Sequence, residues 1–93
     1  MPENEQRLHA IVHGYVQGVS FRYYTQIRAN ELGLGGWVRN LPERTVEVVA
    51  EGPRSQLEKL LLFLHTGSSA ARVARVDVDW GLATGQFRDF CIH

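Results

Sequence analysis

An α+β sandwich is the fold class that this sequence predicts, on two observations. First, segments of alternating apolar residues and segments of helical spacing follow one another in the order strand, helix, strand, strand, helix, strand along 93 residues. Second, 44% of the residues are hydrophobic, which suits one small globular core and is too high for a disordered chain. This element order is that of the ferredoxin-like βαββαβ fold, whose mostly antiparallel sheet has the order 4-1-3-2 and carries both helices on one face.

The first predicted strand covers residues 8–13, where an apolar residue stands at every second position. The largely polar residues 1–6 are expected to form a flexible tail, so that a single domain spans residues 7–93. A helix is predicted over residues 21–32, because four residues share one of its faces at spacings of four, four and three: Phe21, Thr25, Ala29 and Leu32.

Two strands and a second helix follow. The strands are predicted over residues 36–40 and 45–51, joined by a connection over residues 41–44. The helix is predicted from four leucines with the spacing of a core-facing stripe, namely Leu57, Leu60, Leu61 and Leu64. Its start has two interpretations, with Pro53 as the first helical residue or Ser55 as the N-cap.

A fourth strand is predicted over residues 76–80, and a short fifth strand over residues 90–92. In the 4-1-3-2 order, strands one and two are parallel with strand three between them, so their C-terminal ends emerge at the same edge of the sheet. The loop after the first strand and Asn40 at the end of the second can therefore converge on one small ligand.

The loop between the first strand and the first helix has the composition of a phosphate-binding loop. Gly14 and Gly18 let the backbone turn where a side chain would obstruct it, ahead of a helix N-terminus whose N–H groups attract an anion. Arg22 adds a planar, permanently charged fork at the mouth of the loop. The predicted phosphate-binding residues are Gly14, Tyr15, Val16, Gln17, Gly18, Val19, Ser20, Phe21 and Arg22.

This loop lacks the residues of the common covalent phosphate chemistries. It contains no Cys and no Asp, and it lacks the spacing of a nucleotide P-loop. Ser20 is its candidate nucleophile, but no His or Lys lies beside it in the sequence to activate it. The residues therefore predict phosphate binding without a covalent intermediate.

Charge and composition exclude several classes of partner. Ten basic residues balance ten acidic ones, so the chain has no electrostatic signature of nucleic-acid binding. No apolar run approaches the roughly 18 residues of a membrane span, and the polar N-terminus has no signal-peptide core. Cys91 is the only cysteine, which excludes an intrachain disulfide and fits a cytoplasmic location. The expected state is a monomer without metal, since His9 and His13 lie too far apart along a strand to share an ion easily.

Three segments of the chain resemble the acylphosphatase family. GYVQGVSFR (14–22) resembles the signature G-x-V-Q-G-V-x-F-R with every fixed position present, and GWVRN (36–40) and VEVVAEG (46–52) resemble a second signature and its continuation. The resemblance covers essentially the whole chain in length and element order. It implies a hydrolase that cleaves the carboxyl–phosphate anhydride of small-molecule acyl phosphates to carboxylate and phosphate ion. It also implies that Arg22 binds the phosphoryl group with the loop amides, that Asn40 positions the attacking water, and that no metal or cofactor takes part.

The chain departs from the family pattern at one position. The pattern has Gly four residues after the Asn, where this chain has Arg44. If the turn needs a positive φ there, a non-glycine residue costs roughly 1–2 kcal/mol; otherwise the hairpin adopts another turn.

Two other functions fit the same element order. An RNA-binding module needs aromatic residues on the central strands and a basic surface, and residues 45–51 (TVEVVAE) offer neither. A non-catalytic domain that senses phosphate or another anion would bind the ion without turnover, and this is the alternative to an enzyme.

Overall fold

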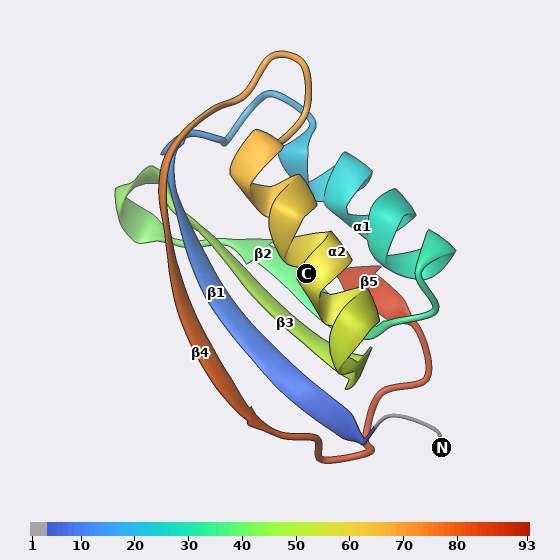
Figure 1. The fold of residues 1–93 in the computed structure, drawn as a ribbon. Helices are drawn as coiled ribbons and strands as arrows, with labels where there is room; N and C mark the ends of the chain where they lie inside the picture. Colours follow the sequence, from blue (N-terminus) through green and yellow to red (C-terminus); the bar gives the residue numbers. More distant parts are fainter. Residues whose placement is uncertain (1–3) are drawn as a thin grey trace.

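The sheet has the predicted strand order, with one strand added at its edge. The computed structural model describes residues 4–93, and these form five strands in the order β4-β1-β3-β2-β5 (Figure 1). In chain order the strands are β1 (Glu5–Tyr15), β2 (Gly35–Asn40), β3 (Val46–Pro53), β4 (Arg72–Leu82) and β5 (Phe90–Ile92). The expected 4-1-3-2 order and the short fifth strand are both confirmed.

The direction of the strands places the ends of β1 and β2 together. Both strands pair antiparallel with β3, so they run parallel to each other with β3 between them. β4 pairs antiparallel with β1, whereas β5 pairs parallel with β2. The segments that follow β1 and β2 therefore leave the sheet at the same edge, as expected from the topology.

The two helices formed by the described residues cover one face of the sheet, side by side (Figure 1). They are α1 (Phe21–Glu31) and α2 (Arg54–Thr66), and a short 3-10 turn, η1 (Pro42–Arg44), joins β2 to β3. Neither interpretation of the start of α2 is right: Pro53 occupies the N-cap position and Ser55 lies inside the helix. Pairing of Pro53 with Glu5 keeps that residue in β3, so the helix begins one residue later. Within residues 4–93 no helix is long and apolar enough to cross a membrane.

The core lies between the helices and the sheet, on the faces that the periodicity indicated. The predicted face of α1 is buried, since Phe21, Thr25 and Ala29 are at most 1% exposed. On α2 three of the four leucines are fully buried, and Leu61 is half-buried and packs against the core. Alternate residues of β1 and β3 complete the core from the sheet side: Leu8, Ala10, Val12, Val46, Val48 and Ala50.

The first strand is longer at both ends than the sequence indicates. Residues 1–3 of the expected tail lie outside the described residues, and β1 begins at Glu5. Glu5 pairs with Pro53, and Gln6 pairs with Gly52 and Leu82, so strand pairing replaces the expected tail at these two positions. At its other end β1 continues through Gly14 and Tyr15, which pair with β4 after a bulge.

Candidate active site

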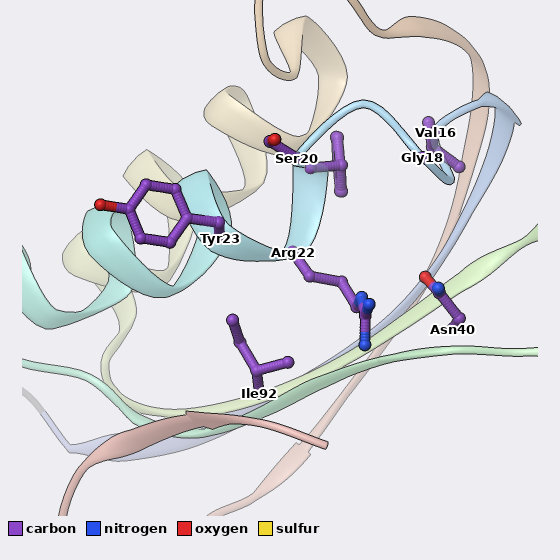
Figure 2. Close-up of a pocket in the computed structure, with 8 residues that line it drawn as sticks. Val16, Gly18, Ser20, Arg22, Tyr23, Asn40 and Ile92 are labelled. Carbon is purple, nitrogen blue, oxygen red and sulfur yellow. The ribbon is translucent and has the colours of Figure 1, made fainter.

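A pocket of about 350 Å³ opens where β1 and β2 end and α1 begins (Figure 2). Its walls come from three separate parts of the chain. The loop after β1 contributes Val16, Gly18 and Ser20, and the first turn of α1 contributes Phe21, Arg22 and Tyr23. Asn40 from the end of β2 and Ile92 from β5 complete the lining. The volume is in the range of small-ligand pockets.

The N-terminus of α1 faces this pocket, and no acidic side chain in its first turn compensates the positive end of the helix dipole. Ser20 occupies the N-cap with a left-handed backbone (φ 60°), and within residues 4–93 its side chain makes no capping hydrogen bond. No acidic residue lies in the first turn of the helix, where Arg22 instead adds a positive charge. A cation at this end opposes the helix dipole, so the arrangement favours the binding of an anion nearby.

Gly14 at the end of β1 and Gly18 in the loop both have a positive φ, 132° and 74°, but only Gly14 also lacks space for a side chain. A Cβ on Gly14 would lie 2.0 Å from the carbonyl oxygen of Arg72, so a side chain there is obstructed as expected. At Gly18 a Cβ would meet no described atom within 4 Å, so the expected obstruction is absent. Gly18 is required by its φ of +74°, which side chains disfavour in any space.

Arg22 and Asn40 approach the pocket from opposite elements. In Figure 2 the Arg22 side chain extends from the first turn of α1 toward Asn40, which ends β2. The Arg22 Nη1 atom donates a hydrogen bond to the carbonyl oxygen of His93 at 3.2 Å. This contact fixes the guanidinium from the side of β5 while leaving its other donors available.

Gln17 holds the loop to the hairpin that carries Asn40. Its Nε2 atom donates to the carbonyl oxygens of Leu41 at 2.9 Å and Thr45 at 2.8 Å. The hairpin itself is closed by a backbone hydrogen bond of 2.9 Å from Leu41 to Thr45. The side chain predicted as part of the phosphate loop thus serves as a brace.

A second brace fastens the loop to the segment after α2. The buried Ser68 hydroxyl donates to the carbonyl oxygen of Val19 at 2.9 Å. Figure 1 shows the loop after β1 beside the connection from α2 to β4. The sequence carries no signal for this contact, because the two residues are 49 positions apart.

The turn between β2 and β3 adopts a left-handed conformation at two non-glycine residues. Glu43 has a φ of 68° and Arg44 a φ of 65°. Of the two interpretations left open at Arg44, the positive φ is therefore right. The turn keeps its shape and Arg44 bears the conformational strain, about 1–2 kcal/mol for a residue with a Cβ.

The structure brings most, though not all, of the predicted site residues together. Val16, Gly18, Ser20, Phe21, Arg22 and Asn40 share the pocket. Gly14, Tyr15 and Gln17 do not line this pocket; with Val16, Gly18 and Arg44 they line a second cavity of about 340 Å³. Gly14 and Tyr15 belong to β1, where they pair with β4 after the bulge that follows His13. Val19 faces the core rather than the pocket.

Two pocket residues were missed by the sequence analysis. Tyr23 follows Arg22 directly, and its place in a helix start gave no reason to single it out. Ile92 enters only because β5 pairs parallel with β2, a contact between distant segments. Among the described residues, none of the side chains that line the pocket is a carboxylate, an imidazole or an amine.

The strand histidines lie on the sheet face opposite the helices, each against a carboxylate. His9 Nε2 is 2.7 Å from Glu47, and His13 Nε2 is 2.8 Å from Asp77. Burial raises the pKa of Glu47, but hydrogen bonds from His9 and Arg39 outweigh it and leave the pKa below its ordinary value. Within residues 4–93 no group of three or more His, Cys, Asp or Glu side chains is placed to hold a metal.

Glu51 is a buried carboxylate that holds the segment after β4. It accepts hydrogen bonds from the backbone N–H groups of Thr84 and Gly85 at 2.9–3.0 Å and from the Thr84 hydroxyl at 2.9 Å. Burial acts to raise its pKa, but these hydrogen bonds and Arg7 lower the pKa below the ordinary value. Glu51 thus holds in place the segment that leads from β4 to β5, and it lies outside the pocket.

Several known proteins with a similar sequence or structure carry the description acylphosphatase. A family model described as Acylphosphatase matches residues 8–92. An acylphosphatase of Acaryochloris marina is 51% identical over 83 residues, covering 89% of this chain and 88% of that protein. One of Mycobacterium avium is 49% identical, with 97% of each chain covered. The crystal structure of acylphosphatase from Bacillus subtilis matches with a TM-score of 0.91 at 34% identity, covering 95% of this chain and 98% of that one.

Proposed function

The chain belongs to the acylphosphatase family and is a hydrolase of acyl phosphates, and we propose that it cleaves them by direct attack of water in the pocket of Arg22 and Asn40. The products are a carboxylate and inorganic phosphate. Catalysis of this bond mainly requires positioning and charge stabilisation, because a carboxylate is a good leaving group.

The loop and Arg22 hold the phosphoryl group in this proposal. Backbone N–H groups of the loop that lines the pocket donate to the nonbridging oxygens, with the N-terminal dipole of α1 behind them. Arg22 forms a bidentate pair with two of these oxygens and stabilises the charge of the in-line transition state. The absence of an acidic residue from the first turn of α1 supports this role, since the anion supplies the missing charge.

Asn40 orients the attacking water through its side-chain amide. The water oxygen forms a bond to phosphorus while the bond from phosphorus to the acyl oxygen breaks, and the carboxylate departs with the bonding electrons. The proton of the water passes to a phosphate oxygen. No protein base is required, which agrees with a pocket whose described lining holds no carboxylate, imidazole or amine.

One observation carries the proposal. A permanent cation and an amide, contributed by α1 and β2, line the same pocket as a glycine-containing loop at a helix N-terminus. A connecting loop has no need of this arrangement, but an in-line displacement at phosphorus has a use for each part. The non-catalytic anion sensor is not favoured, because the similar curated proteins carry the name of an enzyme.

We further propose that the chain works as a single domain and a monomer in the cytoplasm, without nucleic-acid partners. Its zero net charge supports the last point, and its single cysteine is consistent with a reducing compartment. Light scattering of the purified protein with and without a nucleic acid tests the monomer and the lack of binding together.

Hydrolysis of benzoyl phosphate, followed by ultraviolet absorbance with and without EDTA, tests the function. Turnover by the wild type should survive EDTA, and Arg22→Ala and Asn40→Ala should each remove most of it. Asn40→Ala should still bind phosphate, because its amide acts on the water. A folded wild type that binds phosphate but does not turn over would instead identify an anion sensor.

A further inference from the structure

The pocket has a polar side and an apolar side. Arg22, Asn40 and the polar groups of the loop form the polar side, and Tyr23 and Ile92 form the exposed part of the apolar side. Val16 and Phe21 also line the pocket but are buried. Tyr23 is 55% exposed and Ile92 38% exposed, and both belong to the few large hydrophobic residues exposed among residues 4–93. Single exposed apolar residues need no explanation, but two that border one ligand pocket indicate a part of the ligand that is apolar.

The apolar wall formed by Tyr23 and Ile92 lies in the direction in which the acyl group must leave. In-line displacement places the leaving group opposite the attacking water. In Figure 2, Ile92 and Tyr23 lie on the side of Arg22 away from Asn40. If Asn40 holds the water and Arg22 the phosphoryl group, the acyl group points toward Tyr23 and Ile92.

The wall is held in place by contacts of its own. The carbonyl oxygen of Phe90 accepts hydrogen bonds from Gln26 at 3.2 Å and Asn30 at 3.4 Å, which fasten β5 to α1. The Tyr23 ring packs edge-on against Tyr24, with ring centroids 5.4 Å apart. An apolar surface that is already positioned can bind a ligand without first being ordered.

We propose that Tyr23 and Ile92 form the acyl subsite of the enzyme and favour acyl phosphates with apolar, and in particular aromatic, acyl groups. This inference rests on the proposed function, since the in-line geometry defines the subsite. The two side chains carry no charge to pair with an anionic acyl group, and their apolar surface offers little to an acyl group as small as acetyl.

The test compares benzoyl phosphate with acetyl phosphate in the wild type, Tyr23→Gln and Ile92→Thr. Glutamine keeps helix propensity at an exposed position of α1, and threonine keeps the branched shape that suits a strand. Leu62→Gln is the matched control, since Leu62 is 70% exposed on α2 and does not line the pocket. The intrinsic reactivities of the two substrates cancel when their kcat/KM ratio is compared between variants.

The benzoyl to acetyl ratio of kcat/KM should fall about threefold to tenfold in Tyr23→Gln and in Ile92→Thr, a range typical of small apolar differences in a pocket. It should be unchanged in Leu62→Gln. The inhibition constant of inorganic phosphate, which has no acyl part, should stay within about twofold in all variants, since apolar contacts add nothing to phosphate binding.

An equal loss for both substrates, or a ratio that does not move, would overturn the subsite while leaving the hydrolase intact. A wild type that hydrolyses neither substrate although it is folded would overturn the proposed function and the subsite with it. Thermal unfolding of each variant excludes loss of fold as the cause of a change.

Discussion

Gln17 of the loop is hydrogen-bonded to Leu41, the residue that follows Asn40, with 2.9 Å between its side-chain nitrogen and the carbonyl oxygen. The same nitrogen donates to Thr45 across the hairpin. One amide therefore ties the loop proposed to hold phosphate to the strand end proposed to hold water. The distance between these two parts decides whether water meets phosphorus in line.

Gln17→Ala should lower kcat for benzoyl phosphate about tenfold to a hundredfold, because small displacements of a positioned group have effects of this size. The inhibition constant of phosphate should change much less, since Arg22 remains. Steady-state kinetics with phosphate as inhibitor separate the two effects. In an Asn40→Ala background the same change should cause little further loss, because Gln17 acts through Asn40. Equal losses in both backgrounds would show that Gln17 acts on the phosphate instead.

Arg44→Gly should stabilise the protein. Glycine relieves roughly 1–2 kcal/mol of strain at a positive φ and loses about 0.5–1 kcal/mol through its more flexible unfolded chain, so the net gain lies between about 0 and 1.5 kcal/mol, with a midpoint of about 0.8 kcal/mol. Urea unfolding measures the difference. Arg44→Ala is the matched control, because it removes the guanidinium but keeps the Cβ and so should give no such gain. A similar gain in both variants would assign the effect to the lost charge.

Glu51→Gln should destabilise the protein by about 1–3 kcal/mol at pH 7, since buried N–H donors lose an ionised acceptor. The pKa of Glu51 lies below its ordinary value of 4.5 in the folded protein. Its contribution is therefore complete above about pH 4.5 and is lost as the pH falls through the folded pKa. Unfolding curves at several pH values should show the two proteins converging in acid.

Glu31→Gln is the control for that pH series. Glu31 forms an exposed pair with Arg28 at 3.5 Å, and such pairs contribute about 0–1 kcal/mol. Its effect at neutral pH should be correspondingly small. A loss as large as that of Glu51→Gln would mean that any carboxylate of this protein has such an effect, and would remove the special role of the Thr84–Gly85 contact.

Alanine at Gly14 and Gly18 should show how much a steric clash adds to the cost of a positive φ, because both glycines have a positive φ but only Gly14 lacks space for a Cβ. Gly14→Ala forces its Cβ against the Arg72 carbonyl and should cost on the order of 3 kcal/mol or more in unfolding free energy. Gly18→Ala has open space and should cost about 1–2 kcal/mol from its positive φ alone. Urea unfolding measures both variants, and equal costs would contradict the assignment.

The features that could be predicted from the sequence are those that depend on local periodicity or on the order of the strands. Alternation and helical spacing indicated every strand and helix, and the buried faces of α1 and α2 followed from them. The sheet topology predicted that Asn40 lies near the loop after β1, because a sheet with β3 between β1 and β2 brings both strand ends to one edge. The pattern around Arg44 identified one of the two strained positions in the turn between β2 and β3, and gave no indication of the other, Glu43.

The features that were missed depend on contacts between distant segments. Gln17 reaches across 24 positions to Leu41 and Ser68 across 49 to Val19, and neither residue stands in a pattern that indicates its partner. Ile92 joins the pocket through parallel pairing of a three-residue strand, which is too short for periodicity to orient. The limits of β1 also depended on its partners, whose pairing extends the strand at both ends.

The pairing of β5 beside β2 has a consequence for how the protein acquires activity. Arg22 and His93 are 71 positions apart, so the contact between them closes a large part of the chain. Contacts of such separation slow folding, because the chain loses much entropy before it gains them. The pocket therefore becomes complete only when two segments of the chain that are far apart in the sequence have met, and its assembly depends on the folding of the whole domain.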